Sequence, residues 1–133
     1  MPLSDDTPLL PIPRPLVLVV DDESSICTVA RLMLERAGYG VDDAGDAATA
    51  MGRALRASQR YSVVLLDVSL PDRSGVEVIP DLRLATRGSP IVLMSGRAEE
   101  DVPDHGAEGY LAKPFTREQL LAAVRAAAAL TPQ

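Results

Sequence analysis

Residues 61–67 read YSVVLLD, and this stretch decides the fold class. A run rich in valine and leucine ends abruptly at an acidic residue, Asp67. A short apolar run of this kind predicts a strand buried on both faces, as in parallel sheets that helices cover on both sides. Pro71 and Gly75 follow, so the chain is expected to turn directly after Asp67.

The same alternation of strand-like and helix-like segments continues in both directions. Strands are predicted at residues 16–20, 39–44, 61–66, 90–94 and 109–112. Helices are predicted at residues 24–37, after Asp46, near residues 76–85 and after Thr116, which forms a capping box with Gln119. Gly38 is expected to end the first helix, and Pro80 to bend or shorten the third. The expected inner faces carry Ile26, Val29, Ala30, Met33, Leu34 and Ala37 in the first helix, Ala47, Ala50, Met51, Ala54 and Leu55 in the second, and Leu120, Leu121, Val124 and Ala127 in the last.

Five such alternations imply a doubly wound α/β fold with a five-stranded parallel sheet and helices on both faces. Ligands of these sheets bind beyond the carboxyl ends of the strands. Chemically useful residues gather at those ends. They are Asp21 and Asp22 after the first strand, Asp67 after the third, Ser95 after the fourth, and Lys113 with Pro114 just past the fifth.

Carboxylates that meet at one sheet edge repel each other unless a cation neutralises them. A hard divalent ion such as Mg²⁺ suits oxygen ligands of this kind. Asp67 could then attack a phosphoryl group, with Lys113 as a point charge and Ser95 as a hydroxyl donor. Each residue alone fits a helix cap or a turn as well. Their joint occurrence on successive strands is what favours a phosphotransfer site.

Four segments carry a resemblance to a known family: LVLVVDDE, VVLLDVSLPDRSG, IVLMSG and GYLAKPF. They are similar to the successive signatures of receiver domains from bacterial two-component response regulators, including the chemotaxis receivers. The resemblance covers residues 15–130 and implies a flavodoxin-like sheet with strand order 2-1-3-4-5. It also implies that Asp67 accepts a phosphoryl group from a histidine kinase or a histidine phosphotransfer protein.

The same resemblance assigns the other site residues. Mg²⁺ (or Mn²⁺) would be held by the side chains of Asp22 and Asp67 and the backbone carbonyl of Ser69, with Asp21 acting largely through water. Ser95 and Lys113 would contact the phosphoryl group, and the Lys113–Pro114 bond would be cis. Ser95 and Tyr110 would form the conformational switch. Ser69 and Arg97 would tune the lifetime of the phosphate.

The chain departs from the family pattern between Ser95 and Gly106. This segment is about one helical turn shorter than usual and contains Pro103. The helix between the fourth and fifth strands is therefore expected to be short, irregular or mobile, and the protein a monomer or weak dimer. His105 is expected to be a solvated loop residue, and residues 99–101 a solvated acidic face.

Bulk properties agree with one domain. The length of 133 residues suits a single domain, which is expected to span residues 15–130. Residues 1–14 are rich in proline and are expected to form a flexible arm or a docking segment. A net charge of −6 opposes direct binding to nucleic acid or to anionic membranes. The single cysteine, Cys27, suits a cytoplasmic protein, and no apolar run could span a bilayer.

Three functions compete at this stage. The leading one is a signalling receiver that catalyses only its own phosphorylation and dephosphorylation and is not an enzyme in the ordinary sense. The second is a receiver-like interaction module that phosphate does not regulate. The third is a haloacid-dehalogenase-type phosphohydrolase, which needs a second acid two residues after the nucleophile, where this chain has Ser69. The output partner, and whether the domain stands alone or belongs to a longer chain, are left open.

Overall fold

The computed structural model describes residues 13–102 and 105–130. Its strands form one parallel sheet in the order β2-β1-β3-β4-β5, which confirms the predicted topology. The strands are β1 (Leu16–Val20), β2 (Gly40–Ala44), β3 (Tyr61–Asp67), β4 (Ile91–Ser95) and β5 (Gly109–Ala112). The helices are α1 (Ser24–Arg36), α2 (Ala47–Arg56), α3 (Gly75–Ala85) and α4 (Arg117–Ala128).

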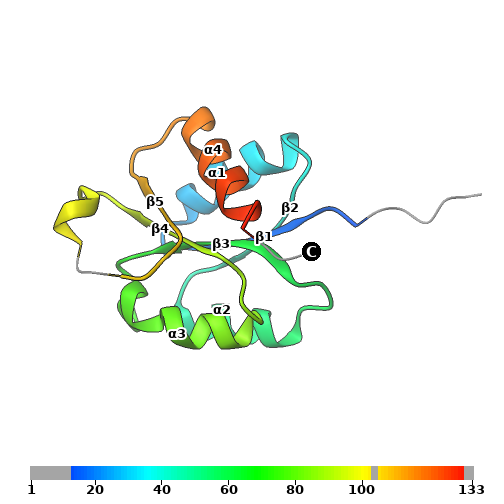
Figure 1. Ribbon diagram of the computed structural model, residues 1–133, viewed down its shortest axis with the longest axis horizontal. Helices are drawn as coiled ribbons and strands as arrows, with labels where there is room; N and C mark the ends of the chain where they lie inside the picture. The colour runs from blue at the N-terminus through cyan, green and yellow to red at the C-terminus, as the bar shows by residue number, and fades with distance from the viewer. Residues whose placement is uncertain (1–12, 103–104, 131–133) are drawn as a thin grey trace, which may run out of the picture.

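Two layers of helices cover the sheet, with α1 and α4 on one face and α2 and α3 on the other (Figure 1). Successive side chains of a strand point to opposite faces, so each central strand supplies both layers of the core. In β3, Val63 and Leu65 pack with α1 and α4, whereas Val64 and Leu66 pack with α2 and α3. This double burial is the reason why β3 reads as a continuous apolar run.

The strand register brings the carboxyl ends to one edge. Val20, the last residue of β1, lies opposite Leu66 of β3, and Asp67 lies opposite Met94 of β4. Asp21, Asp67 and Ser95 consequently sit at nearly the same height on three adjacent strands. The parallel arrangement thus creates a site from residues that are far apart in the sequence.

Local signals at the helix ends act as the sequence predicts. Gly38 has a φ of +100°, the left-handed conformation in which glycine commonly follows a helix. The Asp46 carboxylate accepts from the Thr49 amide at the start of α2. Thr116 and Gln119 form both bonds of the capping box at α4.

Some details of the helix faces were predicted wrongly. Val29 and Leu55 are 43% and 71% exposed, although both were expected on inner faces. In α1 the buried positions include Cys27 and Ala30, and Val29 is turned away from Ala30 by about 100° and from Cys27 by about 200° around the helix. Pro80 lies inside α3, and the helix continues beyond it to Ala85.

The segment between β4 and β5 is short, as predicted. Its described residues contain a single 3₁₀ turn, Glu99–Asp101, followed by the buried Val102, and no α-helix. Residues 103–104 lie outside the described part. The expected arm also lies largely outside it; of its last residues, Arg14 accepts a hydrogen bond from the Gln59 side chain through its carbonyl oxygen at 2.6 Å. Among the described helices, none combines the length and apolar character needed to cross a membrane.

Candidate functional site

Lys113 occupies the centre of the predicted site. Its Nζ lies 2.6 Å from Asp21 Oδ2, 3.5 Å from Asp67 Oδ1 and 3.8 Å from Glu23 Oε1. These groups come from the ends of β1, β3 and β5, so one ammonium joins three strands. Glu23 was not predicted as part of the site, because its place beside the lysine depends on the turn after β1.

Asp67 and Asp21 are both buried beneath the surface of this edge. Burial, followed by the negative charge of Asp21, raises the pKa of Asp67 to about 6, against the opposing effect of Lys113. Burial also disfavours the charged form of Lys113, but the hydrogen bond to Asp21 and the charges of both aspartates leave its pKa raised. The three groups therefore form a strongly coupled cluster in which negative charge is in excess.

The carboxylates present a ligand set that fits a divalent cation. Oxygen atoms of Asp21, Asp22 and Asp67 lie within 4.8 Å of one another, and Asp22 is exposed. One ammonium, that of Lys113, faces the carboxylates of Asp21, Glu23 and Asp67, so the lysine alone does not neutralise the cluster. Oxygen-only ligands with open access to water match the preference of Mg²⁺, which keeps several water molecules when it binds carboxylates.

An open pocket of about 580 Å³ lies over this cluster. Asp22, Asp67, Ser69, Gly96 and Lys113 are among the residues that line it. A phosphoryl group placed there would meet the Asp67 carboxylate and the Lys113 ammonium together. Arg97 does not line the pocket; its backbone N–H donates to Ser95 Oγ at 3.0 Å.

The loop after Asp67 is anchored by contacts that sequence reasoning missed. Asp72 accepts from the amides of Ala47 and Ala48 at 2.9 and 3.0 Å, so it caps α2 from another part of the chain. These amides lower the pKa of Asp72, that of Ala47 contributing most. Only the Pro-Asp pair in this loop gave any sequence signal, and it did not identify the partner.

Gly75, at the start of α3, packs directly on the backbone of Asp67. Its amide donates to the Val68 carbonyl at 2.7 Å, and a Cβ added to Gly75 would lie 2.1 Å from the Asp67 carbonyl oxygen. Real Cβ atoms do not approach a backbone oxygen this closely. A side chain at this position must therefore displace the backbone that carries Asp67.

We expect Gly75→Ala to destabilise the protein by about 1–3 kcal/mol, as overpacking typically does, and to weaken Mg²⁺ binding. Urea unfolding and calorimetric titration with Mg²⁺ measure the two effects. Gly45→Ala is the matched control, because an added Cβ there meets nothing within 4 Å. Equal behaviour of the two variants would show that the Gly75 contact does not hold the acceptor in place.

The raised pKa of Asp67 predicts an unusual pH dependence for the metal-free protein. The folded pKa of about 6 exceeds the ordinary aspartate pKa of 3.8, so the folded state binds the proton more tightly than the unfolded state. The contribution of Asp67 to the free energy of unfolding is present at low pH. It is lost as the pH rises from 3.8 through about 6, by about 3 kcal/mol in total.

Comparison of the wild type with Asp67→Asn isolates this contribution. Between about pH 4 and pH 7 the unfolding free energy of the wild type should fall relative to the variant, because acids such as Asp72 titrate alike in both proteins. Chemical denaturation at several pH values measures the difference. Saturating Mg²⁺ should remove the pH trend; a difference independent of pH without metal would contradict the expectation.

Tyr110 and His105 lie together beside this edge. The Tyr110 hydroxyl donates to the Arg97 carbonyl at 2.5 Å, and its ring stacks on that of His105. The expectation of a solvated His105 was wrong, because its side chain is only 12% exposed and contacts Glu99 and the Ala107 amide. Nothing in the sequence around His105 signalled these contacts. By contrast, residues 99–101 are exposed, as predicted.

The structure also has the Lys113–Pro114 bond in the cis form. A family model described as the response regulator receiver domain matches residues 17–125. The chain belongs to this family. Receiver domains are the phosphoacceptor modules of two-component signalling systems, so the predicted family and class of function are confirmed.

Individual relatives agree with the assignment. The receiver is similar to the uncharacterized transcriptional regulatory protein YkoG of Bacillus subtilis (strain 168), with 40% identity over 117 residues, or 84% of this chain and 50% of that protein. The chain spans about half the length of the curated relatives it matches.

Solved structures match over nearly their whole length. The chemotaxis response regulator CheY4 of Vibrio cholerae aligns with a TM-score of 0.76 at 30% identity, covering 86% of this chain and 98% of that one. The receiver domain of the sensor histidine kinase PA1611 from Pseudomonas aeruginosa PAO1 has a TM-score of 0.74 at 29% identity, covering 89% and 99%. That structure holds a magnesium ion in its active site cleft.

Proposed function

We propose that Asp67 is the residue that accepts the phosphoryl group, and that a histidine kinase or histidine phosphotransfer protein donates it. The observation that carries this proposal is the position of the Asp67 carboxylate, which lines an open pocket within 3.5 Å of Lys113. With a pKa of about 6, most Asp67 carboxylates are ionised at neutral pH and able to act as nucleophiles.

The phosphoryl transfer forms one bond to phosphorus and breaks another. An Asp67 carboxylate oxygen attacks phosphorus, the bond from phosphorus to the donor imidazole nitrogen breaks, and that nitrogen keeps the electron pair and takes up a proton. Lys113 stabilises the negative charge on the phosphoryl oxygens, and the Ser95 hydroxyl donates a hydrogen bond to one of them. Hydrolysis of the acyl phosphate by water later returns the free carboxylate.

The acidic residues supply the metal site that this chemistry needs. The side chains of Asp22 and Asp67 and the Ser69 carbonyl would hold Mg²⁺, with Asp21 acting through water. When bound, the ion neutralises charge on the transferring group. Lys113, which contacts both Asp21 and Asp67 in this structure, would then share the Asp67 carboxylate with the metal.

Four residues would control the conformational response and the lifetime of the phosphate. Ser95 and Tyr110 form the conformational switch, while Ser69 and Arg97 influence how long the phosphate persists. The protein acts in the cytoplasm, for which its lone Cys27 is suited, and catalyses only its own modification. The transcriptional role in the name of YkoG belongs to that longer protein.

The test uses the purified protein, a small phosphodonor such as acetyl phosphate or phosphoramidate, and Mg²⁺. Intact mass spectrometry should show one added phosphoryl group, and chelation of the metal should prevent its appearance. Absence of the adduct, with Mg²⁺ binding shown independently by calorimetry, would favour the interaction module that phosphate does not regulate. Multiple turnover on small phosphate esters would instead indicate a phosphohydrolase.

A further inference from the structure

A continuous series of contacts leads from Ser95 to His105. The backbone N–H of Arg97 donates to Ser95 Oγ at 3.0 Å, and the Arg97 carbonyl accepts from the Tyr110 hydroxyl at 2.5 Å. The Tyr110 ring then stacks on the His105 ring, with centroids 6.1 Å apart and planes inclined by 29°. The Arg97 backbone therefore links the hydroxyl at the site to an aromatic pair outside it.

The His105 ring is held at both of its nitrogen atoms. Nδ1 accepts a hydrogen bond from the Ala107 amide at 2.9 Å, and Nε2 lies 3.3 Å from Glu99 Oε2. Because Nδ1 acts as an acceptor, the ring proton lies on Nε2 and points to the glutamate. With its side chain only 12% exposed, the imidazole forms a fixed surface and not a freely rotating loop side chain.

A fixed imidazole limits where Tyr110 can lie. Stacked aromatic rings prefer defined separations and offsets, and the observed centroid distance falls within that range. The stack directs the Tyr110 hydroxyl to the Arg97 carbonyl, and this bond in turn steadies the peptide whose N–H reaches Ser95 Oγ. A hydroxyl that accepts from an amide keeps its own proton free to donate.

We propose that His105, supported by Glu99, is a positioning residue for the phosphoryl site. It holds Tyr110 so that the Arg97 backbone orients the Ser95 hydroxyl toward an incoming phosphoryl group. This inference rests on the proposed function, and it extends the expected Ser95–Tyr110 pair to residues in the unusual segment between β4 and β5. A Ser95 hydroxyl that is already oriented lowers the entropic cost of binding the phosphoryl group.

The closing experiment uses beryllium fluoride with Mg²⁺ as a non-covalent mimic of the phosphoryl group. We expect His105→Ala to weaken its binding about fivefold or more, the scale of coupling between linked sites. Acetyl phosphate should also modify the variant more slowly. His105→Phe keeps an aromatic ring for stacking and loses both hydrogen bonds, so it should recover part of the loss.

A second readout separates positioning from general loosening. The sequence contains three tyrosines, Tyr39, Tyr61 and Tyr110, so protein labelled with fluorotyrosine gives three fluorine signals. The signal lost in Tyr110→Phe identifies Tyr110. In His105→Ala this signal should move, while those of Tyr39 and Tyr61 stay in place.

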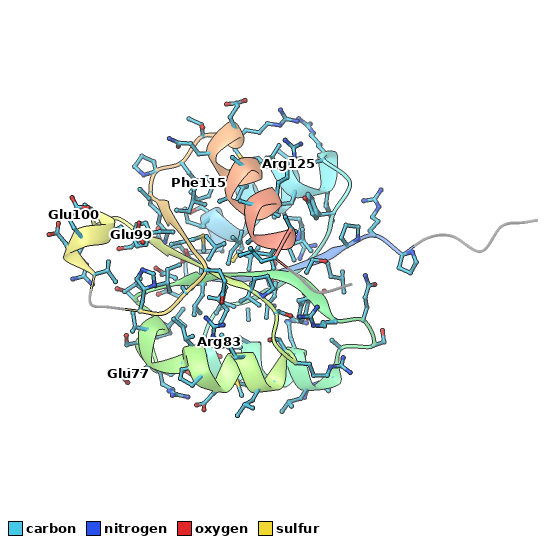
Figure 2. The ribbon with its side chains drawn as sticks, viewed as in Figure 1. Glu77, Arg83, Glu99, Glu100, Phe115 and Arg125 are labelled. Carbon is cyan, nitrogen blue, oxygen red and sulfur yellow. The ribbon has the colours of Figure 1, made fainter. Side chains whose placement is uncertain are left out.

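The neighbouring acids supply a matched control pair. Glu99 and Glu100 both lie on the turn at the edge of the molecule (Figure 2), but only Glu99 has a described contact with His105. Glu99→Ala should shift the Tyr110 signal and weaken beryllium fluoride binding, and Glu100→Ala should do neither.

Unchanged beryllium fluoride affinity in His105→Ala would overturn the inference, and so would an unchanged Tyr110 signal. Movement of all three tyrosine signals would also overturn it, since this would indicate a general structural role. If the wild type binds neither beryllium fluoride nor a phosphoryl group, the proposed function itself fails. The fluorine spectrum of the free protein still decides in that case whether His105 holds Tyr110.

Discussion

Asp67→Asn should take up no phosphoryl group under conditions in which the wild type takes up one. The amide has nearly the shape of the carboxylate but is a poor nucleophile, so the substitution removes the chemistry and retains the side-chain volume. Intact mass spectrometry with acetyl phosphate and Mg²⁺ measures the result. The expected effect is complete loss of the adduct.

Electrostatics also predict that this variant stays folded. Asp67 is buried beside Asp21, and both burial and that charge raise its pKa, so removal of its charge relieves an unfavourable arrangement. The metal-free variant should therefore be at least as stable as the wild type at neutral pH.

Asp81→Asn is the control for this substitution. Asp81 is an exposed aspartate that pairs with Arg73, and it lies on α3 away from the pocket lining. This variant should be phosphorylated like the wild type. Retention of the adduct in Asp67→Asn would place the acceptor on another side chain and overturn the assignment.

Lys113→Met should impair the protein in two separate ways. Without metal, the variant leaves the buried carboxylates of Asp21 and Asp67 without their cation, and loss of one partner from a buried ion pair costs about 3–5 kcal/mol. With metal, it lacks the ammonium that we propose stabilises the phosphoryl oxygens, so modification by acetyl phosphate should be strongly slowed.

Mg²⁺ distinguishes these two effects. Lys113 and the proposed ion both neutralise Asp67, so Mg²⁺ should stabilise Lys113→Met more than it stabilises the wild type. Thermal unfolding across a Mg²⁺ titration measures this difference. Recovery of stability should not restore the phosphorylation rate.

Arg117→Met removes one positive charge from an exposed position on α4 and serves as the control. It should change neither stability nor phosphorylation appreciably, because an exposed charge is well solvated. If Lys113→Met matched this control in stability, the ion pairs at the centre of the site would contribute nothing to the fold.

Much of the fold could be predicted because its signals are local. The apolar run at residues 16–20 and the short strand at residues 109–112 have the predicted bounds. In a parallel sheet, the ends of such runs must meet at one edge, so Asp21, Asp67 and Lys113 could be brought together without coordinates.

The remaining features depend on contacts that no local pattern carries. Gly75 matters because of the nearby Asp67 carbonyl, and Asp72 because of free amides that start a helix elsewhere in the chain. His105 was expected to be solvated because its partners, Glu99 and Tyr110, become neighbours only when the segment between β4 and β5 closes. Similarly, helical spacing alone did not distinguish the buried Cys27 from the exposed Val29.

The position of Lys113 has a spectroscopic consequence. It is the only lysine in the sequence, and its ammonium contacts the carboxylates of the proposed acceptor site. Labelling of the lysine side chain with ¹⁵N therefore gives a single side-chain nitrogen resonance, which needs no assignment. Metal, protons and phosphate would each alter that resonance at its source. The sequence thus provides a built-in reporter nucleus, and every change of state at Asp67 can be followed through one line in a spectrum.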